Sequence, residues 1–276
     1  MPPHTNAKGR LMEPRVWNIL RGTYKHFIPE KHQDKVRNLC GKLLAPFYAG
    51  SRVNCPCCGR GFRKFLPAGI AGRENARCPG CGSLERNRQA MLYLREKTSL
   101  LTEICRVLHI APEPSLQKLL KRTSSVESIS LDLFSSIADI KGDVTDLPFK
   151  DQFFDAIICS HVLEHVYEDR KAMNEFFRVL KPSGFAILQI PVDLARDSTY
   201  EDSTVTLPAD RERLFGQEDH VRVYGRDFTD RLQSSGFDVV VDFFGADFEK
   251  SEYDRFGLAT DEPIYRCQKP TIHAMQ

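Results

Sequence analysis

Four segments between residues 106 and 166 constrain the fold of this chain more than any other feature. Each runs from an apolar stretch into an acidic or loop-forming residue, and they cover residues 106–116, 128–133, 142–149 and 154–166. Parallel strands that alternate with helices deliver such residues to one edge of a sheet. The pattern therefore predicts a doubly wound α/β sheet that binds a nucleoside-containing cofactor at the carboxyl ends of its strands.

The alternation of strand and helix continues towards the end of the chain. The predicted strands cover residues 104–110, 128–133, 137–143, 154–160, 185–192, 238–244 and 263–269, and the predicted helices cover 114–122, 170–184 and 225–237. Gly184 and Gly236 are expected to end the last two helices in a left-handed conformation. The segment between Asp132 and Ile137 is too short for a full helix, so the second crossover is expected to be truncated.

The composition is that of a folded protein with one large domain and an accessory part. Of the 276 residues, 41% are hydrophobic, which is enough for a sizeable core. The sequence begins without an apolar secretion signal, and no apolar run is long enough to span a bilayer, so we expect a cytoplasmic protein. Nine cysteines in such a chain favour metal binding or free thiols over disulfides.

The net charge of +2 conceals two regions of opposite sign. Residues 1–98 contain 19 Lys and Arg but 6 Asp and Glu, whereas residues 99–276 contain 20 and 31. A basic N-terminal third can attract RNA, an acidic glycan or, as a peripheral contact, an anionic membrane surface. The alternative is that it docks on the acidic C-terminal part, and the sequence favours neither.

Two cysteine pairs form the strongest motif of the first third. Cys55 and Cys58 in CPCCG, with Cys78 and Cys81 in CPGCG, give the spacing C-x2-C-x19-C-x2-C. Each pair can present two thiolates to one tetrahedral Zn²⁺, and the intervening segment can form a small hairpin. No residue supplies an obvious open coordination position, so the metal is expected to be structural. The alternative is four ordinary buried cysteines.

These features divide the chain into three expected regions. Residues 1–50 form a basic arm with two short amphipathic helices. Residues 51–98 form a small zinc-ribbon domain with four cysteine ligands, followed by a connecting helix. Residues 99–276 form the large domain, with an insertion at 193–223.

Two acidic residues stand at successive strand ends of the predicted sheet. Asp132 ends the second strand, about twenty residues after the first turn, where a carboxylate can accept both ribose hydroxyls. Asp143 ends the third strand, where its carboxylate can accept from an adenine amino group while the Val144 amide donates to the ring. Together the two acids suit an adenosine.

Two motifs, GDVTDLPFKDQFFDAIICSHVLEHV at 142–166 and RVLKPSGFAIL at 178–188, carry a family resemblance. They are similar to elements of the class I S-adenosylmethionine-dependent methyltransferases of the ubiquinone-biosynthesis type. The resemblance covers residues 104–192 and implies a Rossmann-like sheet of seven strands with an antiparallel final hairpin. It implies S-adenosylmethionine as cofactor and methyl transfer as reaction. The cofactor site would contain Asp132, Asp143 and their neighbours Leu133 and Val144, together with Ser160 and His161 after the fourth strand.

The turn after the first strand departs from that family. Where the family has a glycine-rich G-x-G-x-G turn, this chain has Ala111-Pro112-Glu113-Pro114-Ser115, with Glu113 at the middle glycine position. Glycines let the backbone come close to the methionine part of the cofactor, and without them this turn must hold that part in another way. We expect Ala111, Pro112 and Glu113 to remain cofactor contacts, with Glu113 or Ser115 meeting the ammonium group. The alternative is a chain that has lost cofactor binding.

The HVLEH motif after the fourth strand contains the candidate catalytic residues. Methyl transfer needs an aligned nucleophile and, for a hydroxyl, thiol or amine acceptor, a group that removes a proton. His161, Glu164 and His165 lie at this turn, and His220 lies in the insertion. We expect them to orient the acceptor or act as base. Similar residues bind a metal in ubiquinone O-methyltransferases and in a small-RNA 2′-O-methyltransferase, so a second divalent ion is one alternative and simple packing is another.

The insertion is expected to cover the acceptor pocket. It is rich in charged side chains and poor in aromatic ones, which favours a polar small molecule or a glycan as acceptor over a flat quinone. RNA methylation through the basic N-terminal region is an alternative, although the fourth strand is not followed by the Asn/Asp-Pro-Pro-aromatic motif of base amino-group methylation. A non-enzymatic adaptor with a degenerate cofactor site is the other alternative.

Overall fold

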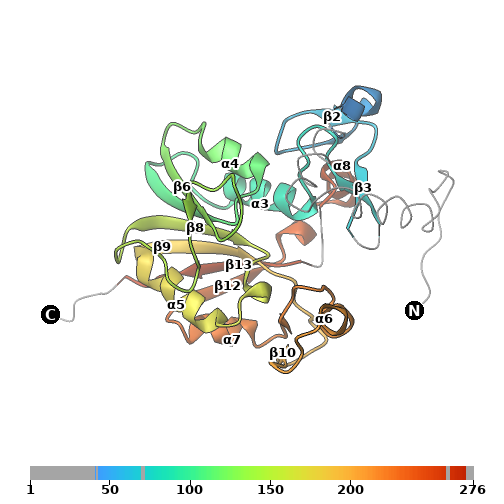
Figure 1. The fold of residues 1–276 in the computed structure, drawn as a ribbon. Coiled ribbons are helices and arrows are strands. Elements are labelled where there is room, and N and C mark those ends of the chain that lie inside the picture. Colours follow the sequence, from blue (N-terminus) through green and yellow to red (C-terminus); the bar gives the residue numbers. More distant parts are fainter. Residues whose placement is uncertain (1–40, 42, 70–71, 259–261, 272–276) are drawn as a thin grey trace. The chain divides into compact units, whose positions relative to one another are not determined.

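Figure 1 shows the fold in a computed structural model of the chain. The structure describes residues 41, 43–69, 72–258 and 262–271. The chain divides into two compact units, Met1–Leu84 and Glu85–Gln276. Most of the expected N-terminal arm lies outside the described residues. The helix that follows the second cysteine pair belongs to the second unit in this division, whereas the sequence grouped it with the cysteines.

The first unit contains two small antiparallel hairpins. Strand β1 (Ala49–Asn54) pairs with β2 (Gly61–Phe62), and β3 (Leu66–Ala68) pairs with β4 (Arg73–Arg77). The buried hydrophobic cluster of this unit is small and includes two of the predicted zinc ligands; its members are Ala45, Val53, Cys55, Phe62, Phe65 and Cys78. A core of this size generally needs a metal or another cross-link to be stable.

The second unit is built on a seven-stranded sheet with the order β12-β13-β9-β8-β5-β6-β7. Its strands are β5 (Cys105–Ile110), β6 (Val126–Asp132), β7 (Ile140–Lys141), β8 (Phe154–Ser160), β9 (Leu180–Gln189), β12 (Asp238–Asp242) and β13 (Ile264–Gln268). Neighbouring strands are parallel except that β13 runs antiparallel to β9 and β12. The predicted doubly wound sheet with an antiparallel final hairpin is confirmed. Its direction of winding changes between β5 and β8, the position at which such sheets bind ligands.

Helices cover both faces of this sheet, with α3 and α4 on one side and α5 and α7 on the other (Figure 1). They are α3 (Glu85–Glu96), α4 (Pro114–Leu120), α5 (Asp169–Val179) and α7 (Phe228–Gln233). Pro114 begins α4, where its missing amide costs no helical hydrogen bond. In α5 the buried residues Ala172, Met173, Phe176 and Val179 recur at helical spacing and form one apolar face.

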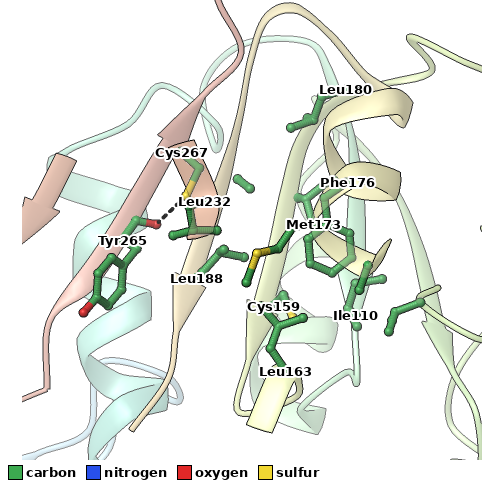
Figure 2. Close-up of a cluster of buried hydrophobic side chains, with 14 of the residues drawn as sticks. Ile110, Cys159, Leu163, Met173, Phe176, Leu180, Leu188, Leu232, Tyr265 and Cys267 are labelled. Carbon is green, nitrogen blue, oxygen red and sulfur yellow. Dashed lines mark hydrogen bonds between the residues drawn. The ribbon is translucent and has the colours of Figure 1, made fainter. Parts of the chain in front are cut away.

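The apolar face of α5 packs in the main core of the second unit. Figure 2 shows Met173 and Phe176 of α5 in the same buried cluster as Cys159 of β8 and Leu188 of β9. Leu163, from the turn after β8, also belongs to this cluster and is 1% exposed. Burying a leucine side chain contributes about 2 kcal/mol. The turn that carries the HVLEH motif is therefore anchored in the core by its own leucine.

The insertion folds as β10 (Tyr200–Glu201), α6 (Pro208–Phe215) and β11 (Arg222–Val223), with β10 and β11 paired antiparallel. A buried ion-pair group holds it to the neighbouring helices. Arg231 of α7 contacts Asp169 of α5 at 3.0 Å and Glu201 of β10 at 2.9 Å. The insertion is therefore an ordered part of the second unit.

The remaining elements are the 3₁₀ helices η1 (Leu163–His165) and η2 (Phe244–Asp247) and the helix α8 (Lys250–Phe256). Residues 133–139 contain no helix, as predicted for a truncated crossover. Gly236 follows α7 with a φ of 100°, as predicted. The prediction for Gly184 is wrong, because α5 ends at Val179 and Gly184 lies inside β9. Among the described helices, none combines the length and the apolar composition that crossing a bilayer requires.

Candidate functional site

The four predicted zinc ligands meet at one point of the first unit. The sulfur atoms of Cys55, Cys58, Cys78 and Cys81 all lie within 4.8 Å of one another. Cys55 and Cys81 are 3.7 Å apart, and Cys58 and Cys78 are 3.8 Å apart. A tetrahedron with metal–sulfur bonds of about 2.3 Å has edges of about 3.8 Å. The spacing of the sulfur atoms thus fits a tetrahedral Zn²⁺ ion.

The turns that carry these cysteines have backbone geometry suited to thiolates. Gly59 and Gly82 have φ angles of 71° and 78°, and their amides donate to the carbonyls of Cys55 and Cys78. Left-handed backbone of this kind favours glycine. The Ser83 hydroxyl lies 3.2 Å from the Cys55 sulfur. A hydroxyl at this distance can donate to a thiolate, as the surroundings of bound metal ligands commonly do.

The glycine-free turn after β5 keeps a glycine-like conformation at one residue. Ala111 has a φ of 47°, in the left-handed region. Pro112 is buried, and Glu113 stands immediately before α4. The Glu113 carboxylate contacts His109 Nε2 at 2.9 Å and accepts from Asn87 Nδ2 at 2.9 Å. Burial alone would raise the pKa of Glu113, but the neighbouring His109 outweighs it and lowers the pKa, so the side chain is an anion at neutral pH.

Asp132 is the last residue of β6 and stands at the carboxyl edge of the sheet. Its Oδ1 atom accepts the amides of Phe134 at 2.7 Å and Ser135 at 2.6 Å. These bonds fix the orientation of the carboxylate, which has capacity for further donors such as ribose hydroxyls. The next residue, Leu133, is 42% exposed at the same edge.

Asp143 follows β7 and stands at the neighbouring strand end. Its Oδ1 atom accepts from the amide and the hydroxyl of Thr145 at 2.8 and 2.9 Å. The adjacent Val144 side chain is 7% exposed. Ser160 ends β8, where its hydroxyl donates to Gln189 at 2.9 Å. The sheet therefore brings the predicted cofactor residues to the ends of neighbouring strands.

His161, directly after β8, lies between two carboxylates. Its Nε2 atom is 2.6 Å from Glu262 Oε1, and its Nδ1 atom is 3.3 Å from Glu164 Oε1. Burial alone would lower the pKa of His161, but the two carboxylates outweigh it and raise the pKa to about 9. An imidazole that is protonated at neutral pH is a poor general base. The geometry thus separates His161 from the role of proton acceptor.

Glu164, His165 and His220 form a compact group whose ligand atoms all lie within 4.8 Å of one another. His165 Nδ1 is 3.2 Å from the Asp219 carbonyl oxygen, and His220 Nδ1 is 3.1 Å from the Phe215 carbonyl oxygen. Since a carbonyl oxygen can only accept, both rings donate through Nδ1. In the neutral rings this leaves the lone pairs of both Nε2 atoms.

Glu164, His165 and His220 bring hydrogen-bond acceptors close together, and two of the three residues are buried. Burial lowers the pKa of His220, which keeps its ring neutral, and Glu164 is 1% exposed. Among the described residues, Oε2 of Glu164 and Nε2 of His220 have no hydrogen-bond partner, and Oε1 of Glu164 has only the 3.3 Å ion-pair contact with His161. Buried acceptors without a donor are costly. One carboxylate and two imidazoles are also a common ligand set for a divalent transition metal.

Arg222 of the insertion fastens the turn that carries this group. Its guanidinium donates to the carbonyl oxygens of Leu163 at 3.0 Å and Tyr167 at 2.8 Å, and also to that of Val166. It also pairs with Glu201 at 2.9 Å. The Arg222 side chain is 3% exposed, so these bonds are protected from water. The insertion therefore positions the HVLEH turn.

Comparison with known proteins identifies part of the second unit. Residues 96–188 match a family described as a methyltransferase domain. Residues 96–188, about a third of the chain, carry a methyltransferase domain of the class I, S-adenosylmethionine-dependent type. This methyltransferase domain contains the turn after β5, both strand-end acids and the HVLEH turn, so the resemblance predicted from the sequence is confirmed.

Similarity of this methyltransferase domain to individual proteins is local. A demethylmenaquinone methyltransferase of Clavibacter sepedonicus is 47% identical over 49 residues, which are 18% of this chain and 20% of that protein. A ubiquinone/menaquinone biosynthesis C-methyltransferase of Yersinia pestis is 40% identical over 52 residues, which are 19% and 21%. An S-adenosylmethionine-dependent methyltransferase structure from Archaeoglobus fulgidus has a TM-score of 0.45 and 16% identity, covering 68% of this chain and 95% of that chain. The chain thus spans about a fifth of the length of the curated relatives it matches.

Three residues of the second unit that the sequence did not single out make contacts at this edge: Asn87, His109 and Glu262. His109 left a signal, because it is a polar residue inside the apolar run of β5. Glu262 left none, because 101 residues separate it from His161. Asn87 lies in a helix rich in charged and polar side chains, where nothing marks it out.

Proposed function

We propose that this protein transfers a methyl group from S-adenosylmethionine to a polar small-molecule acceptor. The observation that carries the proposal is the pair of oriented carboxylates, Asp132 and Asp143, at neighbouring strand ends of a methyltransferase domain. S-adenosylmethionine supplies an electrophilic methyl group when bound. The chain's own residues then bind the adenosine, align the acceptor and accept its proton.

The surroundings of the HVLEH turn support a polar acceptor. His161, Glu164, His165 and His220 gather there, and Asp219 adjoins His165 at 3.3 Å. Charged and hydrogen-bonding groups of this kind suit hydroxyl, amine or carboxylate substituents better than a flat apolar ring. The relatives named for menaquinone and ubiquinone biosynthesis make a quinone-type ring the competing acceptor class.

Proton removal is assigned to the imidazoles of the turn that retain an Nε2 lone pair. His165 is half-buried with its ring against that of His220, the ring centroids being 4.7 Å apart. The protonated His161 is proposed to orient the acceptor as a hydrogen-bond donor. A glycan acceptor falls within the same polar class and is distinguished by assay.

As an alternative to proton removal, Glu164, His165 and His220 are proposed to hold a second divalent ion, because an Nε2 lone pair that binds a metal cannot also accept a proton. The unsatisfied acceptors of that group support it, as do the Nδ1 bonds of both histidines, which orient the Nε2 atoms for ligation. His161, considered with this group on sequence grounds, lies outside the three ligand positions, because its Nε2 atom pairs with Glu262 and its Nδ1 atom with Glu164. The ion would supply a Lewis acid beside the acceptor.

A structural Zn²⁺ is proposed at Cys55, Cys58, Cys78 and Cys81, where it would stabilise a unit with very little core. The described residues from 41 to 84 contain six Arg and Lys against one Glu, which keeps RNA as an alternative acceptor. RNA binding of this kind would weaken steeply with salt. The zinc unit could equally serve only to stabilise the chain.

Calorimetry, followed by a radiolabel-transfer assay, tests the proposal. The zinc-loaded full chain is first titrated with S-adenosylmethionine; absence of binding would favour the non-enzymatic adaptor. Transfer of label from S-adenosylmethionine tritiated at the methyl group is then measured with pools of polar metabolites, glycans, RNA and demethylmenaquinone. Label in the polar pool supports the proposed acceptor class, and label confined to the quinone or RNA pool contradicts it.

A further inference from the structure

The carboxylate of Glu113 is held by two residues from different elements. His109, the next-to-last residue of β5, contacts Glu113 Oε2 through Nε2 at 2.9 Å. Asn87, in the first turn of α3, donates through Nδ2 to Glu113 Oε1 at 2.9 Å. Each carboxylate oxygen therefore has one fixed donor. The side chain that replaces the middle glycine of the family's turn is consequently held in one place.

Both residues that donate to Glu113 are buried. His109 is 1% exposed and Asn87 is 6% exposed. Burying a polar side chain is costly unless it is hydrogen-bonded, and the contact with Glu113 provides such a bond for His109 Nε2 and for Asn87 Nδ2. The Glu113 side chain itself is 18% exposed. The group thus has two covered donors and one carboxylate on a partly exposed side chain.

The carboxylate is placed where the fold binds the methionine part of the cofactor. Glu113 follows β5, the strand next to the point at which the winding direction changes. A carboxylate can accept about four hydrogen bonds, and two are used here, so it retains capacity for a cationic donor. Its pKa is lowered, which keeps it anionic at neutral pH. An ammonium group is the cation that S-adenosylmethionine brings to this end of its site.

We propose that Asn87 and His109 are positioning residues that fix the Glu113 carboxylate as the acceptor for the cofactor's ammonium group. The inference rests on the proposed binding of S-adenosylmethionine. Ala111, in the left-handed region, makes the sharp turn that a glycine makes elsewhere. Glu113 supplies an ionic contact in place of close backbone approach. The glycine-free turn is then a different way of holding the same part of the cofactor.

The test compares two ligands that differ only at the relevant end. S-adenosylhomocysteine and 5′-methylthioadenosine share the adenosine and a thioether sulfur, but only the first has the amino-acid part. Calorimetry on the zinc-loaded full chain gives the Kd of each. Glu113→Gln is expected to weaken the binding of S-adenosylhomocysteine about 10- to 100-fold, which corresponds to the loss of one charged hydrogen bond. Binding of 5′-methylthioadenosine is expected to be unchanged, which also shows that the variant is folded.

The positioning role predicts the same pattern for the two supporting residues. Asn87→Leu and His109→Leu are expected to weaken the binding of S-adenosylhomocysteine about 10-fold and to leave the binding of 5′-methylthioadenosine unchanged. His109→Gln retains a donor and is expected to recover part of the loss. Matched controls are Glu127→Gln, at the other end of β6 and paired with Arg106, and Asn174→Leu, on the exposed side of α5.

The outcomes separate this inference from the proposed function. If the wild-type chain binds neither ligand, the proposed cofactor is wrong. If the wild-type chain binds both ligands but the variants weaken both equally, the residues only support the fold and the inference fails. An unchanged Kd for S-adenosylhomocysteine in Glu113→Gln also overturns it. Selective loss of S-adenosylhomocysteine, with partial recovery in His109→Gln, supports it.

Discussion

The Nε2 atom of His161 lies 2.6 Å from the Oε1 atom of Glu262, although 101 residues separate them in the chain. Together with Glu164, this partner raises the pKa of His161 to about 9. The raised pKa means that the fold stabilises the protonated form of the His161 ring. The contribution of this ring to the free energy of unfolding is therefore complete below the unfolded pKa of about 6.5 and is lost as the pH rises through 9.

Glu262→Gln is expected to lower the pKa of His161 towards its ordinary value, because one of the two carboxylates that favour the imidazolium is neutralised. The measurement is a magnetic resonance titration of ¹³C-labelled histidine rings from mildly acidic to alkaline pH. His161→Gln assigns the resonance, and Glu252→Gln on the exposed face of α8 is the matched control. A His161 that titrates near its ordinary value of about 6.5 in the wild-type chain would contradict the geometry.

Arg222→Met is expected to lower the free energy of unfolding by about 1 to 3 kcal/mol, the usual cost of leaving buried acceptors without their donor. The side chain is 3% exposed, and its loss leaves Glu201 and three backbone carbonyls without this donor. Urea unfolding followed by circular dichroism measures the change. Arg226→Met is the control, because its pair with Asp197 is exposed and should contribute less than about 1 kcal/mol. Equal effects in the two variants would show that Arg222 does not fasten the turn.

The second unit shows which parts of a fold can be predicted from sequence. The strands and their winding follow from the alternation of apolar strands and helices, because each strand pattern is local and the crossovers of such sheets follow one handedness. The prediction for Gly184 fails because the glycine after KPS resembles a helix end. Its actual constraint is close approach within β9, where a Cβ would come within 2.9 Å of the Asp155 carbonyl oxygen.

The candidate site depends on contacts that the sequence does not indicate. The sequence indicates the group of Glu164, His165 and His220 because the first two share a motif, but the exclusion of His161 depends on Glu262, far away in the chain. Similarly, Glu113 stands out by its departure from a family pattern, whereas its contact with Asn87 becomes visible only in the structure. Contacts between distant segments carry no local period, so sequence patterns cannot supply them.

Cys78→Ser is expected to abolish stoichiometric zinc binding and to unfold the first unit. Structural zinc in small domains typically provides on the order of 10 kcal/mol of folding free energy, and the hydrophobic cluster of this unit is small. Metal content by mass spectrometry and limited proteolysis of the unit are the measurements. Cys57→Ser is the matched control, because Cys57 lies between the predicted ligands Cys55 and Cys58 but outside the four-sulfur group. Zinc loss in the control alone would reassign the ligand set.

Asp132→Asn is expected to weaken S-adenosylhomocysteine binding at least about 10-fold, because hydrogen bonds from ribose hydroxyls to a charged acceptor are each worth about 1.5 to 3 kcal/mol. Asparagine keeps an Oδ1 atom for the amides of Phe134 and Ser135, so the turn is preserved. Calorimetry gives the Kd, and Asp238→Asn on the exposed β12 is the control. Undiminished binding would show that the ribose is held elsewhere.

If the group of Glu164, His165 and His220 is a metal site instead of a base, it is expected to bind one divalent transition metal ion in addition to the zinc of the first unit. Mn²⁺ serves as probe, because the four thiolates prefer zinc and Mn²⁺ can be followed by electron paramagnetic resonance. Glu164→Gln and His220→Gln should each weaken the ion about 10- to 100-fold, the usual scale for perturbed metal sites. Glu212→Gln, exposed on α6, should leave the Kd unchanged. If the zinc-loaded wild-type chain takes up no Mn²⁺, the facing acceptors must instead share a proton or a water molecule, and the proposed second ion is wrong.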